Sequence, residues 1–185
     1  MNLELTNLHV LITGGSKGIG LACARGFIAE GARVTLVSRT LETLQSAQRE
    51  LQSATPSATV NIIPADLRNA AEAERMVEAV ERDFGAVDVL VNSAGAAKRT
   101  PAAELTTDAW HDAMQAKFFT YIHVINPLIK KMGARGRGAV VNVVGAGGKV
   151  AAVTHLAGGS PNAALMLASS GLAAAYAGKG VRVNA

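Results

Sequence analysis

The sequence predicts an α/β protein of one domain, built on a doubly wound parallel β-sheet with helices on both faces. Short apolar segments rich in β-branched residues alternate along the chain with longer amphipathic segments. Strict alternation of strand and helix is typical of βαβ units, whose strands run parallel and whose crossovers are right-handed. The 185 residues, 49% of them hydrophobic, suffice for one buried core, and no linker, repeat or low-complexity segment interrupts them.

The individual elements follow from this alternation. Six near-continuous apolar segments are predicted as strands buried on both faces, at residues 9–14, 33–38, 59–64, 87–92, 139–144 and 181–184. Five helices are predicted between them, at residues 18–29, 41–53, 70–84, 107–132 and 161–177. The predicted domain therefore occupies residues 1–185.

Composition and charge restrict the classes of partner. The chain carries 18 basic and 14 acidic residues, a net charge of +4, and its one dense basic group is Lys130, Lys131, Arg135 and Arg137. We assign this group to a helix end near Gly133, where cations complement the helix dipole, in preference to a nucleic-acid-binding patch. With no signal-peptide pattern and no apolar run of about 18 residues, we expect a cytoplasmic protein without membrane or nucleic-acid partners. We assign no metal site.

The segment TGGSKGIG, residues 13–20, joins the first predicted strand to the first predicted helix. Glycines at positions 14, 18 and 20 let the backbone turn sharply and approach a pyrophosphate, while amides at the helix start point toward negative charge. The spacing G-x-x-x-G-x-G differs from the commoner G-x-G-x-x-G fingerprint, and a tight strand-to-helix connection would also explain it. Its place at the carboxyl end of a strand predicts a Rossmann-type nucleotide site.

The end of the second predicted strand bears on the choice of nucleotide. An acidic residue there would accept hydrogen bonds from the adenosine ribose and repel a 2′-phosphate, but this chain has Ser38 followed by Arg39. Together with Lys17, Arg39 can bind that phosphate through charge-assisted hydrogen bonds. We therefore expect NADP(H) in preference to NAD(H), with two solvated surface cations as the alternative interpretation.

From about residue 5 to residue 185 the chain resembles the short-chain dehydrogenase/reductase family. The matching segments, in order, are TGGSKGIG, Asp66–Leu67, NSAG at 92–95, Trp110, GAVVNV at 138–143 and VRVN at 181–184. The resemblance implies pyrophosphate binding by Gly14, Ser16, Lys17, Gly18, Ile19 and Gly20, adenine contacts from Asp66 and Leu67, and a nicotinamide-ribose path lined by Asn92, Ala94 and Gly95. Asp66 could instead cap the helix near Asn69, and NSAG could be an ordinary turn.

The catalytic positions depart from the family. The resemblance implies an asparagine, a serine, a tyrosine and a lysine, at positions where this chain has Lys117, Gly145, Gly158 and Asn162. Lys117 and Asn162 look like an exchange of the family's asparagine and lysine, with the cation reaching the pocket from the opposite wall. The two tyrosines, Tyr121 and Tyr176, are expected to be packing residues.

His155 is the nearest group able to exchange a proton near neutral pH, although a histidine on a glycine-flanked surface loop is the simpler interpretation. Catalytic residues are thus unassigned beyond the weak candidates His155 and Lys117. We expect an NADP(H)-binding oxidoreductase with a non-standard site that acts on a carbonyl or alcohol. A catalytically inactive NADP(H)-binding sensor or partner subunit is the alternative.

Two expectations concern the rest of the molecule. The resemblance implies a sheet that continues past residue 184 into a further strand and substrate-covering helices, whereas this sequence stops at Ala185. Either the natural chain is longer, or this is a truncated form whose substrate side is open. Residues 162–178 are small and apolar around much of the predicted helix. Because the family commonly pairs its two long helices across a two-fold axis, we expect a homodimer or homotetramer.

Overall fold

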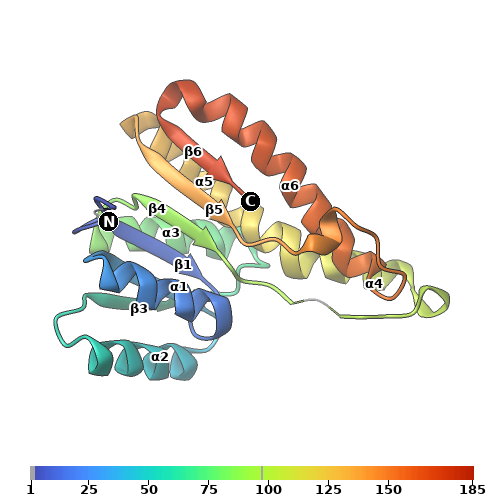
Figure 1. Ribbon diagram of the computed structural model, residues 1–185, viewed down its shortest axis with the longest axis horizontal. Coiled ribbons are helices and arrows are strands. Elements are labelled where there is room, and N and C mark those ends of the chain that lie inside the picture. Colours follow the sequence, from blue (N-terminus) through green and yellow to red (C-terminus); the bar gives the residue numbers. More distant parts are fainter. Residues whose placement is uncertain (1–2, 97) are drawn as a thin grey trace.

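The structure is a computed structural model that describes residues 3–96 and 98–185. Six parallel strands form one sheet in the order β3-β2-β1-β4-β5-β6 (Figure 1). The strands are β1 (His9–Thr13), β2 (Arg33–Ser38), β3 (Val60–Pro64), β4 (Val89–Asn92), β5 (Gly138–Asn142) and β6 (Val181–Asn184). The predicted doubly wound α/β sheet is confirmed.

The strand order reverses beside β1. This strand pairs with β2 on one side and β4 on the other, so that Ile12 lies between Leu36 and Val91. The chain winds from β1 outward to β3 and then returns to form β4 on the opposite side. In such sheets the gap between the diverging carboxyl-end loops is the usual ligand site, which places it after β1 and β4.

Alternate residues of each strand separate two hydrophobic cores. Val10 and Ile12 belong to the core beneath α1 (Gly18–Ala29) and α2 (Leu41–Ala54). Leu11 belongs to the core shared by α3 (Ala70–Phe84), α5 (Thr120–Arg135) and α6 (Leu156–Tyr176). Since successive strand residues face opposite sides, helices cover both faces of the sheet, as predicted.

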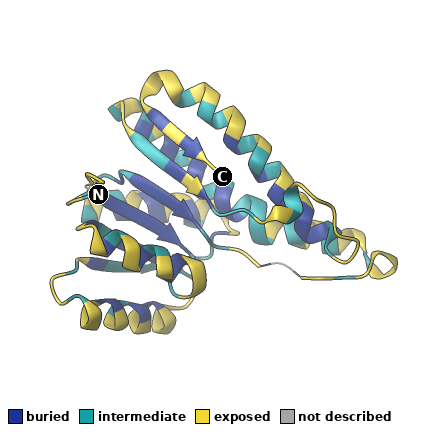
Figure 2. Ribbon diagram, viewed as in Figure 1, coloured by how far each residue is buried: buried dark blue, intermediate teal, exposed yellow. Residues whose placement is uncertain are grey.

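The expectation that every strand is buried on both faces is wrong for β5 and β6. Val140 and Val183 pack into the core beneath α5 and α6, but Val141 is 39% exposed and Arg182 is also exposed. On this side of the sheet Ala139 and Val143 are only partly buried against the core beneath α1 and α2, and Figure 2 shows exposed positions on β6. β1, by contrast, is buried at every residue.

Two predicted helix boundaries are also wrong. The single helix expected over 107–132 is α4 (Thr107–Ala113), a π-helical segment (Met114–Phe119) and α5. α6 begins at Leu156, a little more than one turn before the predicted start at Pro161, because Gly148 and Gly159 allow the preceding loop to pack against this first turn. α4 and the first turns of α6 extend past the carboxyl ends of the strands (Figure 1).

Three of the four cations in the basic group at the end of α5 form ion pairs among the described residues. The helix ends at Arg135 rather than near Gly133, and Gly136 follows in the left-handed conformation typical of a helix end. The pairs are Lys131–Glu81, Arg135–Glu81 and Arg137–Asp88. These contacts support the helix-end interpretation of the group. Among the described residues, no helix combines the length and apolarity needed to cross a membrane.

Candidate cofactor cleft and catalytic cavity

A cleft of about 510 Å³ lies over the carboxyl ends of β1 to β4. Most of the residues implicated by the sequence line it together: Gly14, Ser16, Lys17, Gly18, Ile19, Ser38, Arg39, Asp66, Leu67, Ala94 and Gly95. The cleft also includes Arg68, Thr40, Thr43 and Thr120, which the sequence analysis did not identify. It therefore brings together segments from four strands at the reversal of strand order.

The glycine-rich turn is closed by backbone contacts. Gly14 has φ +65°, and a Cβ there would lie 2.9 Å from the backbone of Ala94. A Cβ on Gly20 would overlap the carbonyl oxygen of Gly14, so Gly20 lies behind the cleft wall and not on it. No side chain caps α1, which leaves the amides of its first turn free to bind an anion.

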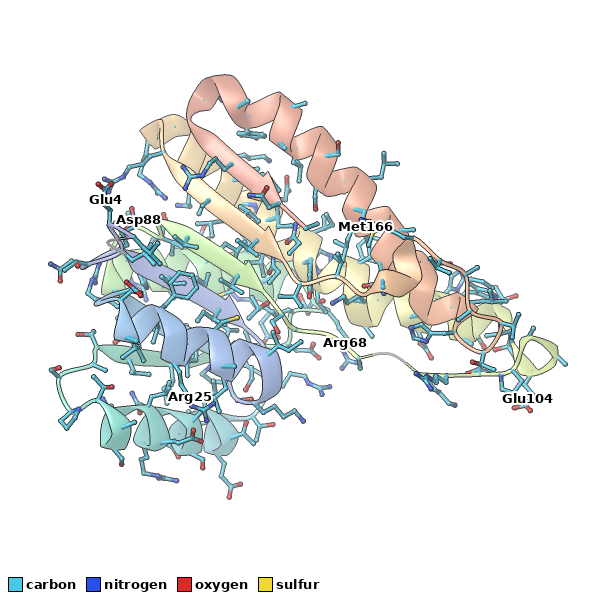
Figure 3. All side chains as sticks on the ribbon, viewed as in Figure 1. Glu4, Arg25, Arg68, Asp88, Glu104 and Met166 are labelled. Atoms are coloured by element: carbon cyan, nitrogen blue, oxygen red, sulfur yellow. The ribbon has the colours of Figure 1, made fainter. Side chains whose placement is uncertain are left out.

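The charge of the cleft is mainly positive. Lys17, Arg39 and Arg68 line it with one carboxylate among the described residues, Asp66. This carboxylate accepts three hydrogen bonds from the Arg68 side chain, at 3.1, 3.2 and 2.7 Å. These hydrogen bonds hold the pKa of Asp66 below its usual value. Figure 3 labels Arg68 at the carboxyl edge of the sheet. Its position two residues after Asp66 was the only sequence signal for it.

Asp66 is not the cap of α3. The side chain of Asn69 accepts the backbone N–H of Glu72 at 3.1 Å, and the Glu72 carboxylate in turn accepts the N–H of Asp66 at 2.8 Å. This reciprocal arrangement resembles a capping box. The capping alternative for Asp66 is therefore wrong, and its carboxylate remains in the cleft wall.

Asn92 supports the cleft from behind. The side chain is fully buried, which contradicts the expectation that it lines the nicotinamide-ribose path. It accepts a hydrogen bond from the Thr13 hydroxyl at 3.2 Å and donates one to Asn142 at 3.0 Å. Thr13 Oγ1 also accepts the backbone N–H groups of Ser93 and Ala94. The NSAG segment is thus a turn held by side chains from two neighbouring strands.

A second cavity of about 290 Å³ adjoins the cleft, sharing Ile19, Gly95 and Ala96 with it. The four positions at which the resemblance implies catalytic side chains line this cavity, and so does the candidate histidine: Lys117, Gly145, His155, Gly158 and Asn162. The π-helical segment, the loop after β5 and the first turns of α6 supply them. The candidate positions taken from the resemblance are therefore neighbours in one cavity.

Lys117 lies deep in this cavity. Its Nζ donates to the Tyr121 hydroxyl at 2.6 Å and to the Val143 carbonyl at 2.7 Å. Burial lowers the pKa of Lys117 to about 8 and raises the pKa of Tyr121. The Tyr121 hydroxyl donates its own proton to Val143 at 2.8 Å, and the residue is fully buried, in agreement with a packing role.

Asn162 holds the glycine-rich loop against α6. Its Oδ1 accepts the backbone N–H of Gly145 at 2.8 Å, and its Nδ2 donates to the carbonyl of Gly158 at 2.8 Å. Both polar atoms of the side chain are therefore engaged. Lys117 and Asn162 share the cavity, as the exchange hypothesis requires. The Asn162 amide, however, forms its hydrogen bonds with the protein backbone.

His155 is not a surface histidine, contrary to the simpler interpretation. It is half-buried immediately before α6, and its Nδ1 is buried with no hydrogen-bond partner among the residues that the structure describes. Its ring also borders a third cavity, lined by Arg99, Val150 and Thr154 among others. The His155 ring is half-buried because α6 begins at Leu156, directly after it, and the first turns of this helix pack on the loop after β5.

Sequence comparisons agree with this arrangement. The profile of the short chain dehydrogenase family matches residues 8–185. D-threitol dehydrogenase of Mycolicibacterium smegmatis is 32% identical over 183 residues, which cover 99% of this chain and 70% of that protein. Gluconate 5-dehydrogenase of Gluconobacter oxydans is 34% identical over 140 residues, 76% of this chain and 54% of that protein. The chain thus matches about half the length of the latter.

Solved structures show the same likeness. L-sorbose reductase of Gluconobacter frateurii, complexed with NADPH and L-sorbose, has a TM-score of 0.93 at 30% identity and covers 100% of this chain and 70% of its own. An NADPH-bound short chain oxidoreductase of Pseudomonas aeruginosa PAO1, described as containing an atypical catalytic center, has a TM-score of 0.91 at 31% identity, with coverages of 97% and 71%. On the match over residues 8–185, the chain belongs to the short chain dehydrogenase family.

Proposed function

We propose that the protein binds NADP(H) in the cleft and catalyses hydride transfer between the nicotinamide and a carbonyl or alcohol substrate. The observation that carries this proposal is the charge of the cleft, in which Lys17, Arg39 and Arg68 face a single carboxylate. That carboxylate, Asp66, is already paired with Arg68. Lys17 and Arg39 have no ion-pair partner among the described residues, which leaves both for phosphate groups.

The residues of the cleft fit the parts of this cofactor. The uncapped first turn of α1, with Gly14, Ser16 and Lys17, would hold the pyrophosphate, and Ser38 with Arg39 would hold the 2′-phosphate. Asp66 and Leu67 would contact the adenine, and Ala94 and Gly95 would lie along the nicotinamide ribose. When bound, the nicotinamide supplies or accepts the hydride.

Two structural relatives support the cofactor and the reaction class. The Pseudomonas aeruginosa oxidoreductase and the Gluconobacter frateurii L-sorbose reductase both contain NADPH. The latter also contains L-sorbose, and D-threitol dehydrogenase is named for a small polyol. We therefore propose a ketose or polyol small enough for the cavity beside Gly95 as the first substrate class to test.

The alternative is an inactive NADP(H)-binding sensor or partner subunit. It is favoured by the substitutions at positions 117, 145, 158 and 162, which remove the family's usual catalytic side chains. The homodimer or homotetramer expected from the sequence would give a partner to Leu167 of α6, which is 78% exposed. NADPH binding without turnover of L-sorbose, D-threitol or gluconate would favour this alternative.

Calorimetric titration with NADPH and NADH tests the cofactor assignment. We expect saturable binding that favours NADPH, and Arg39→Ala should weaken NADPH binding about 10- to 100-fold with little effect on NADH, since it removes a charged hydrogen bond. Arg49→Ala is the matched control, because Arg49 is exposed on α2 and does not line the cleft. Absence of binding to either nucleotide would overturn the proposal.

A further inference from the structure

His155 and Lys117 lie in one cavity with different surroundings, and these surroundings distinguish their roles. We propose that His155 holds the substrate oxygen through a hydrogen bond from Nε2, and that Lys117 supplies the proton which this oxygen takes up on reduction. The assignment rests on the proposed NADP(H)-dependent hydride transfer. It adds a catalytic pair in place of the substituted side chains.

The imidazole occupies the space of a missing side chain. A Cβ added to Gly158 would overlap Cε1 of His155 and lie 2.8 Å from both ring nitrogens. On the other side, a Cβ added to Gly147 would lie 3.3 Å from Cδ2 of the same ring. The ring and any side chain at position 158 therefore exclude one another. Glycines on both sides leave a slot that holds the imidazole where a side chain at position 158 would begin.

The buried nitrogen indicates which tautomer is present. A proton on Nδ1 of His155 would be a buried donor without an acceptor among the described residues, which is an unfavourable arrangement. We therefore place the proton on Nε2, from which the ring can donate a hydrogen bond. Such a ring can hold and polarise a carbonyl oxygen without giving up its proton.

Lys117 is the side chain of this cavity that can donate a proton to the substrate oxygen. Two of its three N–H bonds are directed to Tyr121 and Val143, and no described contact uses the third. The Tyr121 proton is committed to Val143, and both polar atoms of Asn162 are engaged, so neither residue is an alternative donor. A lysine pKa of about 8 suits proton transfer near neutral pH.

The charged and titratable groups around the pair are few. Tyr121 lies against Lys117, and Arg99 lines the cavity on the far side of His155. No carboxylate is among the described residues that line either cavity. The proton of Lys117 therefore has no nearby carboxylate to receive it, and the substrate oxygen is the acceptor that the cavity provides.

In the direction of reduction, the reduced nicotinamide held in the cleft would supply a hydride to the carbonyl carbon and would be left oxidised. As the new C–H bond forms, the C=O π pair would move onto oxygen. That oxygen takes a proton from Lys117 and forms an O–H bond, and the electron pair of the broken N–H bond stays on Nζ. His155 keeps its proton throughout. A proton from solvent then restores the charge of Lys117, so reduction consumes one solvent proton, and alcohol oxidation follows the reverse course.

Gly158→Ala tests the position of the ring without removing a titratable group. We expect kcat/KM for NADPH oxidation by L-sorbose or butane-2,3-dione to fall at least about 100-fold, because the new Cβ displaces the imidazole. The NADPH dissociation constant should stay within about twofold, since position 158 does not line the cofactor cleft. Gly171→Ala is the control, because its Cβ would meet nothing within 4 Å in the same helix.

Variants of the two side chains separate their roles. His155→Gln keeps a side-chain N–H donor and should retain turnover within about tenfold with a raised KM, whereas His155→Leu should lose about 100-fold. The wild-type rate of reduction should fall as pH rises through about 8, the pKa of Lys117. The Lys117→Met variant should reduce the substrate more slowly, and its rate should not fall as pH rises through this range. In the Lys117→Arg variant the fall in rate should occur at higher pH. Nitrogen-15 NMR of histidine-labelled protein should show the Nε2–H tautomer for His155.

Each contrary outcome has a distinct meaning. A proton on Nδ1, a fully active His155→Leu variant, or an unchanged pH profile in Lys117→Met would overturn the assignment. If NADPH binds but is not oxidised by L-sorbose or butane-2,3-dione, the assignment is also overturned, while the cofactor proposal stands. Failure of the wild-type protein to bind NADPH would instead refute the proposed function, and the assignment of His155 and Lys117 would fall with it.

Discussion

The proposed cofactor cleft and the proposed catalytic cavity are neighbours, but they are built in different ways. The cleft is formed largely by backbone: a glycine-rich turn, the amides of α1 and the ends of four strands. The cavity depends on side chains from the π-helical segment, the loop after β5 and the first turns of α6. A site formed by backbone atoms tolerates little change in its glycines. In a site formed by side chains, a residue at a neighbouring position can take the place of one that is missing. Here Lys117 and His155 are the candidates for such rebuilding.

Gly20→Ala should have the largest effect, because the cleft depends on backbone contact. The new Cβ would overlap the carbonyl oxygen of Gly14 and lie 2.8 Å from its carbonyl carbon, and backbone cannot move aside as a flexible side chain can. We expect a loss of about 3 kcal/mol in the free energy of unfolding and at least about 100-fold weaker NADPH binding, measured by urea denaturation and calorimetry.

Gly26→Ala is the matched control in the same helix. Its Cβ would meet nothing within 4 Å, and the position is exposed. Alanine there should increase stability by about 0.5–1 kcal/mol, because it lowers the backbone entropy of the unfolded chain. Equal effects of the two variants would contradict the view that the cleft is defined by backbone.

A buried polar chain joins the two sites, and its loss should have the second largest effect. Asn142 accepts from Asn92 at 3.0 Å and donates to the Ser169 hydroxyl at 2.9 Å, which connects β4, β5 and α6. Asn142→Ala would leave the buried Nδ2 group of Asn92 without its acceptor, and it would remove the donor to Ser169, whose hydroxyl still donates to the Leu165 carbonyl. We expect a loss of about 2–3 kcal/mol in urea denaturation. Asn61→Ala, which removes one bond of 3.4 Å to Thr35, should cost less than about 1 kcal/mol.

The same contrast explains what the sequence could predict. Glycine spacing, strand ends and apolar alternation are local features, so the sheet, the bounds of α1 and α3, and most of the cleft wall followed from the sequence. Asn92 was misplaced because local sequence does not tell whether a residue at a strand end faces a ligand or a neighbouring strand. Arg68 was missed because its role depends on a bidentate contact with Asp66.

The catalytic side required tertiary information. The sequence makes a surface position the simpler interpretation of His155 beside its weak candidacy as a catalytic residue, because the early start of α6 and the packing of Gly147 and Gly158 around the ring are not visible in the local pattern. The π-helical segment that contains Lys117 was equally hidden within an uninterrupted helical periodicity. The four positions nevertheless line one cavity, because the resemblance assigns them from neighbouring strand and helix segments, such as Trp110 and GAVVNV, and not from the catalytic side chains.

The smallest predicted effect concerns the stability cost of Lys117. Its pKa is about 8 in the folded protein and 10.5 in the unfolded chain, so below pH 8 both states carry the charge and the folded state bears the desolvation penalty. Between 8 and 10.5 the unfolded chain holds more protons, and stability rises with pH; above 10.5 the penalty is absent. Lys117→Met should therefore stabilise the protein by about 1 kcal/mol at neutral pH, after allowance for partial exposure to solvent.

The test is urea denaturation of both proteins from below pH 8 to above pH 10.5, in which the gain from Lys117→Met should shrink as pH rises. Lys130→Met is the control, because Lys130 is exposed on α5 and its replacement should give a difference that does not follow this pattern. A gain that stays constant with pH would mean that the folded protein does not disfavour the charged lysine. In that case the cavity would be more hydrated than its burial indicates, and Lys117 would be a weaker proton donor near neutral pH.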